Sequence, residues 1–568
     1  MTKTSKRIKI SLLIIVGIIL LALISAFLYA YIGGSKALKQ YLTETLAKQT
    51  KGLYRMDIKD LDITLIPGWI SIKGVTLTPD TARYRHLLEE DSAGSVLFTV
   101  RISKIQVRGV DFISMVRKKK IEIGQVIIAD PAIEIDLFKI NKKKEEPKAK
   151  QKLKLQINLP PAIQSLNLDE IRLSKGSLKI RDHKGDSLKE TYFPSITFEV
   201  DNIHTDQSGL SDNRLFNADD IRLIIAGYSM NTSNGMNSIS LGELSVSTGK
   251  SQIKLKKFSL KPLLGRKEYA KSAGFQTDQM TITIDSITLS GLKLDTAILN
   301  GKILVKRLAV NGLQLEDFRD QSYPRKPGLK PPLPQDMIPK IPVKFFIDTV
   351  SVDKSKVIYS ERKKAGPGTV FFNDLSGKLY PLTNDSLMLQ QSYTMHLDGA
   401  AMLMGKGKIK ASFAFKVPDK NSRFTLSATV GPMDLREFNQ VVTPLAGISI
   451  TSGKLIKMEI PTIEFNKEKS TGLLKFYYSS LEIKLIKKDT TDWSSIKSSV
   501  LGWAANTYVS SDNPRANGKF KEGIILWHRD QEKSIFNYLW KSVFTGLKST
   551  VGINNKEQKA IKKERKKK

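Results

Sequence analysis

The five histidines offer the most direct test for catalytic chemistry, because histidine serves near neutral pH both as a general base and as a metal ligand. They are His86, His183, His204, His396 and His528, and none has a second histidine or a cysteine at metal-ligand spacing. The chain contains no cysteine at all. This distribution predicts no metal site and no bound cofactor.

Acidic and nucleophilic motifs are equally sparse. The run at residues 89–91 (EED) is typical of a charged loop tip, and Asp182 and His183 fall in an expected turn. The sequence has no phosphate-binding loop, no dinucleotide fingerprint and no G-x-S-x-G elbow. We therefore expect no catalytic residues and predict that the protein is not an enzyme. The alternative is a glycan- or lipid-modifying enzyme whose site is assembled from distant residues.

An uncharged run near the N-terminus determines how the rest of the chain is interpreted. Residues 10–32 carry no charged side chain. At about 1.5 Å per helical residue they reach roughly 34 Å, which is enough to cross a bilayer core. Basic residues crowd the leader, residues 1–9, and favour a cytoplasmic N-terminus. We expect an uncleaved anchor and a single-pass protein of a bacterial inner membrane, with its body in the periplasm.

Beyond the anchor the hydrophobic period changes. Residues 33–52 are expected to form a juxtamembrane helix, and alternation of apolar and polar residues then predicts strands with one apolar face. The same strand–turn–strand pattern recurs at residues 121–135, 166–180, 282–294 and 345–359. The second and fourth copies align at an offset of 179 positions, so that Ile171 falls on Val350. This recurrence indicates an internal duplication.

Composition shifts divide the chain into segments. A charged linker and a proline-rich connector separate three β units, and a helical region and a basic tail follow. The expected segments are the leader 1–9, the transmembrane helix 10–32, the juxtamembrane helix 33–52, a first β unit 53–138, the charged linker 139–160, a second β unit 161–316, the proline-rich connector 317–340, a third β unit 341–490, the C-terminal helical region 491–553 and the basic tail 554–568.

A sheet with one apolar face must hide that face, and the predicted helices are too few to cover it. The strands either fill a sandwich or solenoid core with their own side chains, or curl into a trough whose floor is covered by lipid acyl chains. The candidate groove-lining residues are Ile63, Leu65, Ile70, Ile72, Val107, Ile123, Ile171, Leu173, Leu178, Ile180, Ile287, Leu289, Val350, Val352 and Val357.

The C-terminal residues combine an apolar helical stripe with a basic tail. Residues 534–551 have helical periodicity, and the chain ends in three lysines. Such a segment suits an anionic membrane surface, and the alternative is a helical cap with a solvated tail. The candidate membrane-surface residues are Phe536, Leu539, Trp540, Phe544, Lys566, Lys567 and Lys568.

The formal net charge of +35, from 91 basic and 56 acidic residues, suggests nucleic acid in a cytoplasmic protein. For a periplasmic body we expect no nucleic acid and favour anionic lipid head groups. A solvated basic surface without a specific partner is the alternative.

The leader, the single span and the alternating β body resemble the AsmA-like family of bacterial envelope proteins, particularly its DUF748-type members. Residues 56–77 (MDIKDLDITLIPGWISIKGVTL) look like the family's first repeat, and residues 432–460 (PMDLREFNQVVTPLAGISITSGKLIKMEI) are similar to its helix-then-hairpin segment. Residues 493–568 depart from the family pattern.

The resemblance implies a mainly β fold, an elongated curled antiparallel sheet that is groove-like or solenoid-like, with an N-terminal transmembrane helix and C-terminal amphipathic helices. It also implies binding or transfer of phospholipid or another lipid along an apolar groove, for outer-membrane biogenesis or maintenance, with other envelope proteins as possible partners. The runner-up is a non-enzymatic envelope scaffold or adaptor with a solid β core.

Overall fold

A computed structural model describes residues 36, 39–40, 42–64, 68–89, 95–138, 163–183, 188–206, 218–363, 366–486, 510–552, 557–559 and 561. The fold is mainly β, as the sequence predicts. The chain divides into two compact units, the first comprising residues 1–230 and 241–254 and the second residues 231–240 and 255–568. Each unit is described by itself below. The expected transmembrane helix over 10–32 lies outside the described residues.

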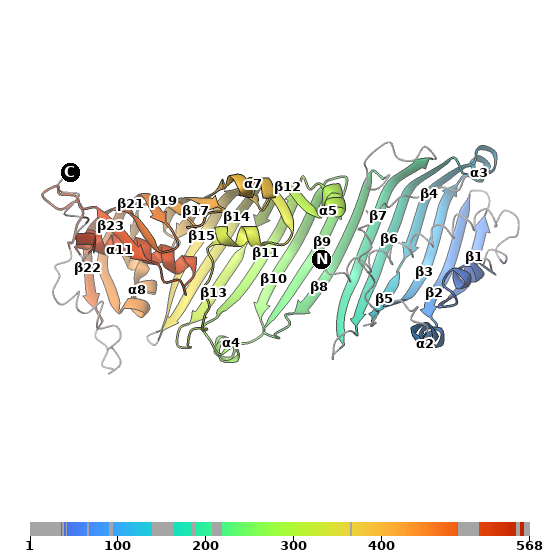
Figure 1. Ribbon diagram of the computed structural model, residues 1–568, viewed down its shortest axis with the longest axis horizontal. Helices are drawn as coiled ribbons and strands as arrows, with labels where there is room; N and C mark the ends of the chain where they lie inside the picture. The colour runs from blue at the N-terminus through green and yellow to red at the C-terminus, as the bar shows by residue number, and fades with distance from the viewer. Residues whose placement is uncertain are drawn as a thin grey trace. The chain divides into compact units, whose positions relative to one another are not determined.

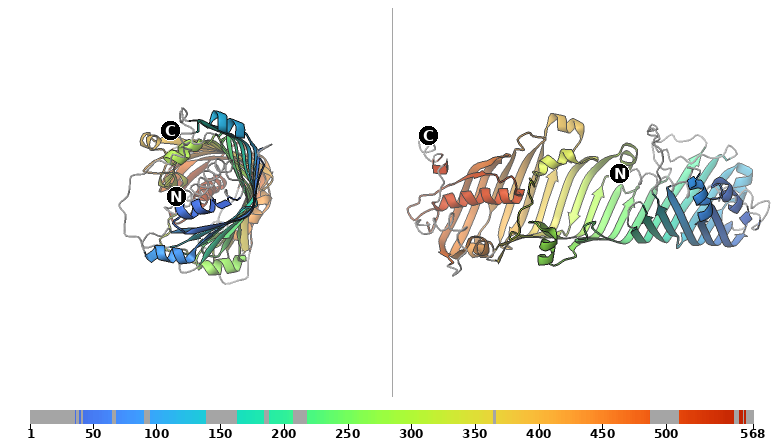
Figure 2. Two further views of the ribbon diagram at one scale, coloured as in Figure 1. Left: turned by 90° about the vertical axis from the view of Figure 1, so that its right-hand side faces the viewer. Right: turned by 60° about the horizontal axis from the view of Figure 1, so that its bottom comes forward.

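The first unit is a curled sheet with short helices between its strands (Figure 1). Its elements are β1 (Tyr54–Thr64), β2 (Trp69–Pro79), α2 (Thr81–Glu89), β3 (Val96–Val110), α3 (Phe112–Lys118), β4 (Lys120–Ala129), β5 (Ala132–Leu137), β6 (Ser165–Asp182), β7 (Lys189–Asp206) and β8 (Asp220–Asn231). Residues 42–49 are also helical, within the expected juxtamembrane helix. Viewed end-on, this helix lies on the concave side of the curved wall (Figure 2, left).

Two further strands, β9 (Asn237–Ser247) and β10 (Gln252–Pro262), contribute residues to both units, as does β8 through its last residue, Asn231. The second unit then continues with α4 (Arg266–Ala273), β11 (Asp278–Ser290), α5 (Leu294–Asn300), β12 (Lys302–Asn311), β13 (Gln314–Asp320), α6 (Pro334–Met337), η1 (Ile338–Lys340), β14 (Lys344–Lys363), β15 (Gly366–Tyr380), β16 (Leu382–Thr383), α7 (Ser386–Gln391), β17 (Tyr393–Leu403), β18 (Gly407–Val417), β19 (Phe424–Val430), β20 (Met433–Asp434), η2 (Leu435–Phe438), α8 (Asn439–Ala446), β21 (Ile448–Phe465), β22 (Lys469–Leu485), β23 (Gly523–His528) and α11 (Ile535–Val551).

Most neighbouring strands are antiparallel, as expected, but β6 and β14 each also have parallel neighbours. β6 runs parallel to β4 and β5, and β14 runs parallel to β12 and β13. A parallel pair needs a connection of a dozen or more residues. The segments between β5 and β6 and between β13 and β14 supply that length, and they contain the charged linker and most of the proline-rich connector that the sequence predicts.

The internal duplication is visible in the hydrogen bonding. In the first unit Asp130 N donates to Ser174 O and Ser177 N donates to Pro131 O. In the second unit Gly312 N donates to Asp353 O and Lys356 N donates to Leu313 O. In both units these bonds lie where two successive short strands meet the one long strand that runs parallel to both. The short helices α3 and α5 repeat as well, because each follows the first antiparallel strand of its motif and ends in a left-handed C-cap.

Irregular positions inside the long strands bend the sheet. The pairing of β6 with β7 shifts register on both sides of Gly176, and the pairing of β14 with β15 shifts on both sides of Ser355. The preceding residues, Lys175 and Lys354, have φ values of 54° and 51°. Such bulges bend a strand and increase its twist. Each bulge also adds one residue to the strand and so shifts the alternation of its side chains by one position. The apolar residues before and after the bulge therefore stay on one face.

Within the C-terminal stretch 491–553, where helices are expected, residues 523–528 form β23 instead. Gly523, Ile524, Ile525 and Leu526 are buried, and the strand pairs with β22 from Lys469↔His528 to Leu474↔Gly523. A short apolar run rich in isoleucine suits a buried strand, and the vacant edge of β22 provides its partner. The expected helix over 534–551 is α11.

Candidate functional site

Apolar residues form continuous cross-strand rows in the first unit. One row crosses β1, β2, β3, β4, β6, β7 and β8 through Ile63, Ile70, Val107, Val126, Ile171, Val200 and Ile221. The next row follows the same strands through Leu61, Ile72, Ile105, Ile128, Leu173, Phe198 and Leu223. We call the face that carries these rows the apolar face of the first unit.

The second unit carries a corresponding row across eight strands, from β11 to β21. It runs through Leu289, Leu308, Val350, Leu379, Leu397, Phe413, Leu426 and Ile463. Beside it, Val352 pairs with Gly377, and Gly377 pairs with Gly399. Beyond the bulge in β14, Val357 lies between Leu315 and Phe372 and continues the same face. This is the apolar face of the second unit.

These rows contain most of the predicted groove-lining residues. The structure places on the two apolar faces Ile63, Ile70, Ile72, Val107, Ile123, Ile171, Leu173, Leu178, Ile180, Ile287, Leu289, Val350, Val352 and Val357. Leu65 and the tail lysines Lys566, Lys567 and Lys568 lie outside the described residues.

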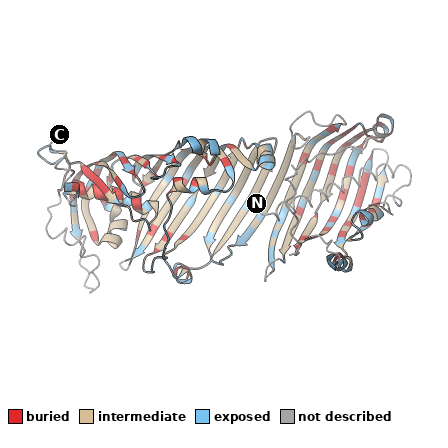
Figure 3. Cartoon of the chain, in the orientation of Figure 1, coloured by how far each residue is buried: buried red, intermediate tan, exposed pale blue. Residues whose placement is uncertain are grey.

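The apolar face of the first unit is covered at one end and half-exposed at the other. Ile70 is 2% exposed and Ile72 is 3% exposed, and Leu42 and Leu46 of the N-terminal helix belong to the same core cluster. Further along the row, Leu173, Phe198 and Leu223 are only partly buried. Figure 3 shows the difference as buried positions on β2 and β3 against intermediate ones on β8.

The second unit has a similar gradient in the opposite chain direction. Leu289, Leu308 and Val350 are partly buried, whereas Leu426 and Ile463 lie in a closed core. A closed core and partly buried apolar rows therefore occur in different parts of this unit.

The connector between β13 and β14 helps to close that core. Leu333 and Ile338 belong to the cluster, and Gln335 Nε2 donates to Ser422 O at 2.8 Å. Ser422 Oγ donates to Asp336 Oδ1 at 2.6 Å. These bonds tie the connector to the loop between β18 and β19, so the proline-rich segment packs on the sheet as part of the core.

Helix α11 packs with its small and hydroxyl-bearing residues against the sheet. Ser542 and Ser470 of β22 share a hydrogen bond of 2.7 Å, and a Cβ on Gly523 would lie 2.2 Å from the carbonyl oxygen of Gly546. The larger set of buried residues in α11 is Tyr538, Ser542, Thr545, Gly546, Ser549 and Thr550.

The aromatic side of α11 points away from the β22–β23 contact. Phe536 is 63% exposed and Trp540 is 39% exposed, while Leu539 and Phe544 are partly buried. A surface helix in a globular protein normally buries its large apolar stripe. Here Leu539 packs against the core cluster, whereas Phe536 and Trp540 stay exposed. These two rings add apolar surface of the kind that contiguous exposed patches use for binding.

A charged island interrupts the apolar face of the second unit across β11, β13 and β14. Arg319 binds Asp278 through two hydrogen bonds of 2.6 and 2.5 Å, and Arg319 pairs across the strands with Glu361. One step along, Asp317 pairs with Tyr359.

Burial, with the negative charges of Asp278 and Glu361, raises the pKa of Asp317 to about 7, although Arg319 opposes the shift. Sequence reasoning missed this island, since 317–340 read as a connector. The alternation of charged residues at 317, 319, 359 and 361 was the available signal.

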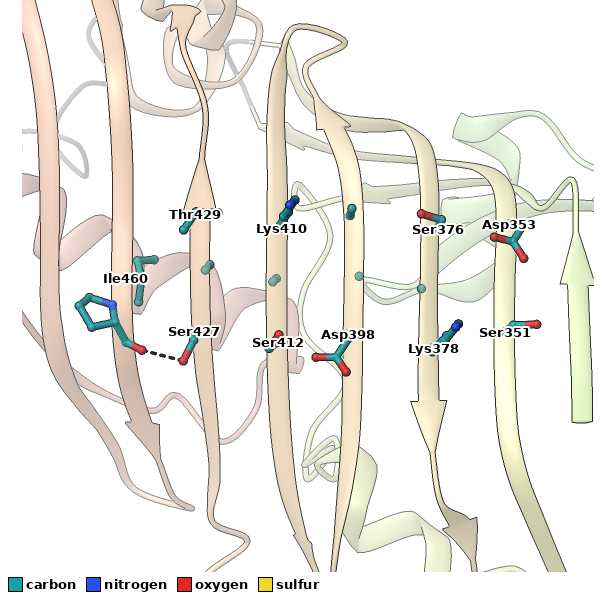
Figure 4. A pocket seen from close by; sticks show the side chains of 16 residues that line it. Ser351, Asp353, Ser376, Lys378, Asp398, Lys410, Ser412, Ser427, Thr429 and Ile460 are labelled. Atoms are coloured by element: carbon teal, nitrogen blue, oxygen red, sulfur yellow. Dashed lines mark hydrogen bonds between the residues drawn. The ribbon is translucent and has the colours of Figure 1, made fainter. Parts of the chain in front are cut away.

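The opposite face of the second unit is polar and slightly hollowed (Figure 4). The hollow has a volume of about 640 Å³ and crosses strands from β14 to β21. Lys378, Asp398 and Ser412 line it, and Tyr380 Oη donates to Asp398 Oδ2 at 2.8 Å. Hydrogen bonds from Ser412 and Tyr380 lower the pKa of Asp398. The hollow is open to solvent and lined by serine, lysine and aspartate side chains, so it offers a polar surface.

The histidines have separate surroundings. His183 Nε2 lies 2.8 Å from Asp136 Oδ1 and stacks on Phe138, and His528 Nε2 lies 3.2 Å from Glu557 Oε2. Within the described residues, no group of three or more His, Asp or Glu side chains is arranged to hold a metal ion.

No protein-family model matches the sequence, and no curated protein matches it. Among the described residues, no helix combines the length and the apolar character needed to span a bilayer.

Proposed function

We propose that this protein binds phospholipid or another lipid by its acyl chains along the apolar faces, and transfers it between membranes of a bacterial envelope. The observation that carries the proposal is the run of cross-strand apolar rows that are only partly buried, through Phe198 and Leu223 in the first unit and through Leu308 and Val350 in the second. An extended apolar surface that the chain itself covers only in part favours an apolar partner.

The physical basis is the hydrophobic effect. Each methylene that leaves water gains about 0.8 kcal/mol, so an acyl chain on an isoleucine, leucine and valine wall is favoured while its head group stays hydrated. No bond changes, and the proposal includes no catalytic step. It also includes an inner-membrane anchor at residues 10–32 and a periplasmic body, because the sequence pattern supports both.

A second candidate function is a scaffold with a solid core. The closed cluster around Leu426, Ile463 and the connector favours this alternative for part of the second unit. The two candidates differ in what they require of the half-exposed positions, because a scaffold does not need them to contact lipid.

Charged substitutions at half-exposed positions separate the two. Phe198→Asp and Val350→Asp place a carboxylate on the apolar faces, and Thr197→Asp and Ser351→Asp place it on the adjacent residue, which points to the opposite face. We expect wild-type protein, purified in mild detergent, to carry lipid at or above one molecule per chain by mass spectrometry. Bound lipid should fall several-fold in the first pair and stay unchanged in the second.

Thermal unfolding would verify that all four variants fold. A wild-type preparation free of lipid, or full lipid occupancy in folded Phe198→Asp and Val350→Asp, would favour the scaffold.

A further inference from the structure

A group of four lysines lies beside the aromatic side of α11. Lys541 and Lys548 belong to α11, Lys533 directly precedes the N-cap of that helix, and Lys363 ends β14. We call these four residues the lysine cluster. Lys541 Nζ lies 5.9 Å from the ring centroids of both Trp527 and Phe544, and Lys548 Nζ lies 5.3 Å from that of Phe544. The cations are therefore held against aromatic surface.

The lysine cluster lacks matching negative charge. None of the ion pairs found among the described residues involves Lys533, Lys541 or Lys548. Burial lowers the pKa of Lys541, and repulsion from Lys363, Lys533 and Lys548 lowers it further, while Glu361 opposes the shift. Burial also lowers the pKa of Lys533 and of Lys548.

The nearby carboxylates already have other partners. Glu361 accepts a hydrogen bond from Tyr359 Oη at 2.5 Å and another from Gln321 Nε2 at 2.6 Å. Asp530, which faces Lys533, also lies 3.4 Å from Arg325 Nη1. Partly buried cations without full compensation are costly unless an anion joins them. The arrangement therefore favours a negatively charged ligand.

The surface next to the lysine cluster is apolar. Phe536 and Trp540 are exposed, and Phe536 stacks on Tyr359 with the ring centroids 6.5 Å apart. This contact brings the start of α11 to β14, so the lysines and the aromatic side of the helix face the same space. A ligand that fits both must be anionic at one end and apolar at the other.

We propose that the lysine cluster binds the head group of a phospholipid with net negative charge, while the aromatic side of α11 contacts its acyl chains. The inference rests on the proposed function and deepens it by naming the lipid class. It assigns selectivity for anionic lipid to the lysines and general lipid binding to the apolar faces. An experiment can therefore contradict one of these assignments without contradicting the other.

The test compares the composition of bound lipid with its amount. The full chain, purified in mild detergent from a membrane containing phosphatidylethanolamine and phosphatidylglycerol, is expected to carry phosphatidylglycerol enriched several-fold over the membrane. Lys541→Gln with Lys548→Gln should bring that enrichment to within about twofold of the membrane composition, with total lipid per chain unchanged. Lys378→Gln with Lys410→Gln, which makes the same change in charge on the opposite face, should leave the enrichment intact.

Several outcomes would overturn the inference. Enrichment that survives the α11 pair, or that falls equally in the control pair, removes the assigned role of the lysine cluster. Equilibrium dialysis with inorganic phosphate is a further measurement. Saturation of the same lysines by millimolar phosphate, without lipid, would indicate a site for free anions instead. A preparation with ample lipid but no enrichment contradicts only this inference, whereas a lipid-free preparation contradicts the proposed function itself.

Discussion

Asp317 is the residue at which the apolar face of the second unit departs most from its own pattern. Its Oδ1 atom is buried and has no hydrogen-bond partner, and its cross-strand neighbours are Met280 and Tyr359. With a pKa of about 7 in the folded state, it keeps a proton that the unfolded chain loses near pH 4. The free energy of unfolding therefore falls as the pH rises from about 4 to about 7, because the folded state must bear the cost of ionising this carboxyl group.

This sign gives a prediction for Asp317→Asn. Between pH 4 and pH 7 the unfolded chain binds fewer protons than the folded chain, so wild-type stability should fall across this window relative to the variant. We expect the variant to gain about 1 kcal/mol on wild type between pH 4 and pH 8, since solvent screens much of the penalty at a partly buried carboxylate. Denaturant midpoints at the two pH values measure it, and a difference that is the same at both would contradict the assigned pKa.

Sequence periodicity predicted the face on which single residues such as Ile171 and Val350 lie, because a strand alternates its side chains whatever its partner is. It could not predict how far each is buried. Ile70 and Leu223 are both aliphatic residues of the apolar face of the first unit, yet only Ile70 is fully buried. Burial depends on which distant segment packs over the row, and local pattern carries no information about that.

At the scale of elements, the packing of α11 on the sheet depends on two glycines, Gly523 and Gly546. A Cβ on Gly523 would lie 2.2 Å from Gly546 O and 2.5 Å from Thr550 Oγ1. Gly546 O belongs to the helix backbone, so moving a side chain cannot relieve this clash. Helix and strand approach closely because neither carries a side chain there.

Gly523→Ala should therefore loosen α11 from β23. We expect a loss of about 1–3 kcal/mol from overpacking and faster hydrogen exchange in the amides of α11. Gly431→Ala is the matched control, since its Cβ would have its nearest neighbour, Lys408 O, at an ordinary 3.6 Å, and should change stability by no more than about 0.5 kcal/mol. Equal effects of the two substitutions would mean that the close approach at Gly523 does not hold α11.

The helix itself was predictable from its period, but its orientation was not. The large stripe predicts the buried side under the ordinary rule. In the structure Leu539 of that stripe packs against the core cluster, Ser542, Gly546 and Ser549 are fully buried, and Phe536 and Trp540 stay exposed. Small residues at spacings of three and four were a usable signal for close packing. Strand direction could not be predicted from the alternation either, because alternation is identical in parallel and antiparallel pairs. Only the long connectors indicated the parallel neighbours of β6 and β14.

At the scale of the whole chain, the two units share one strand arrangement, as the internal duplication predicts. Each builds a long strand against two short parallel ones, bends it at a bulge, and keeps apolar residues on one side throughout. The offset of 179 positions between Ile171 and Val350, found in the sequence, corresponds to equivalent positions in the two motifs. The recurrence of partly buried apolar rows in both copies is what the lipid-binding proposal explains.

The most direct measurement places a photo-crosslinking amino acid at Phe198 or Val350 of the full chain in the cells that express it, with Thr197 and Ser351 as controls on the opposite face. Mass spectrometry of the irradiated, purified protein then detects covalent lipid adducts. We predict phospholipid adducts at the first two positions and none above background at the controls. Absence of adducts at Phe198 and Val350, or equal labelling of both faces, would contradict lipid binding along the apolar rows.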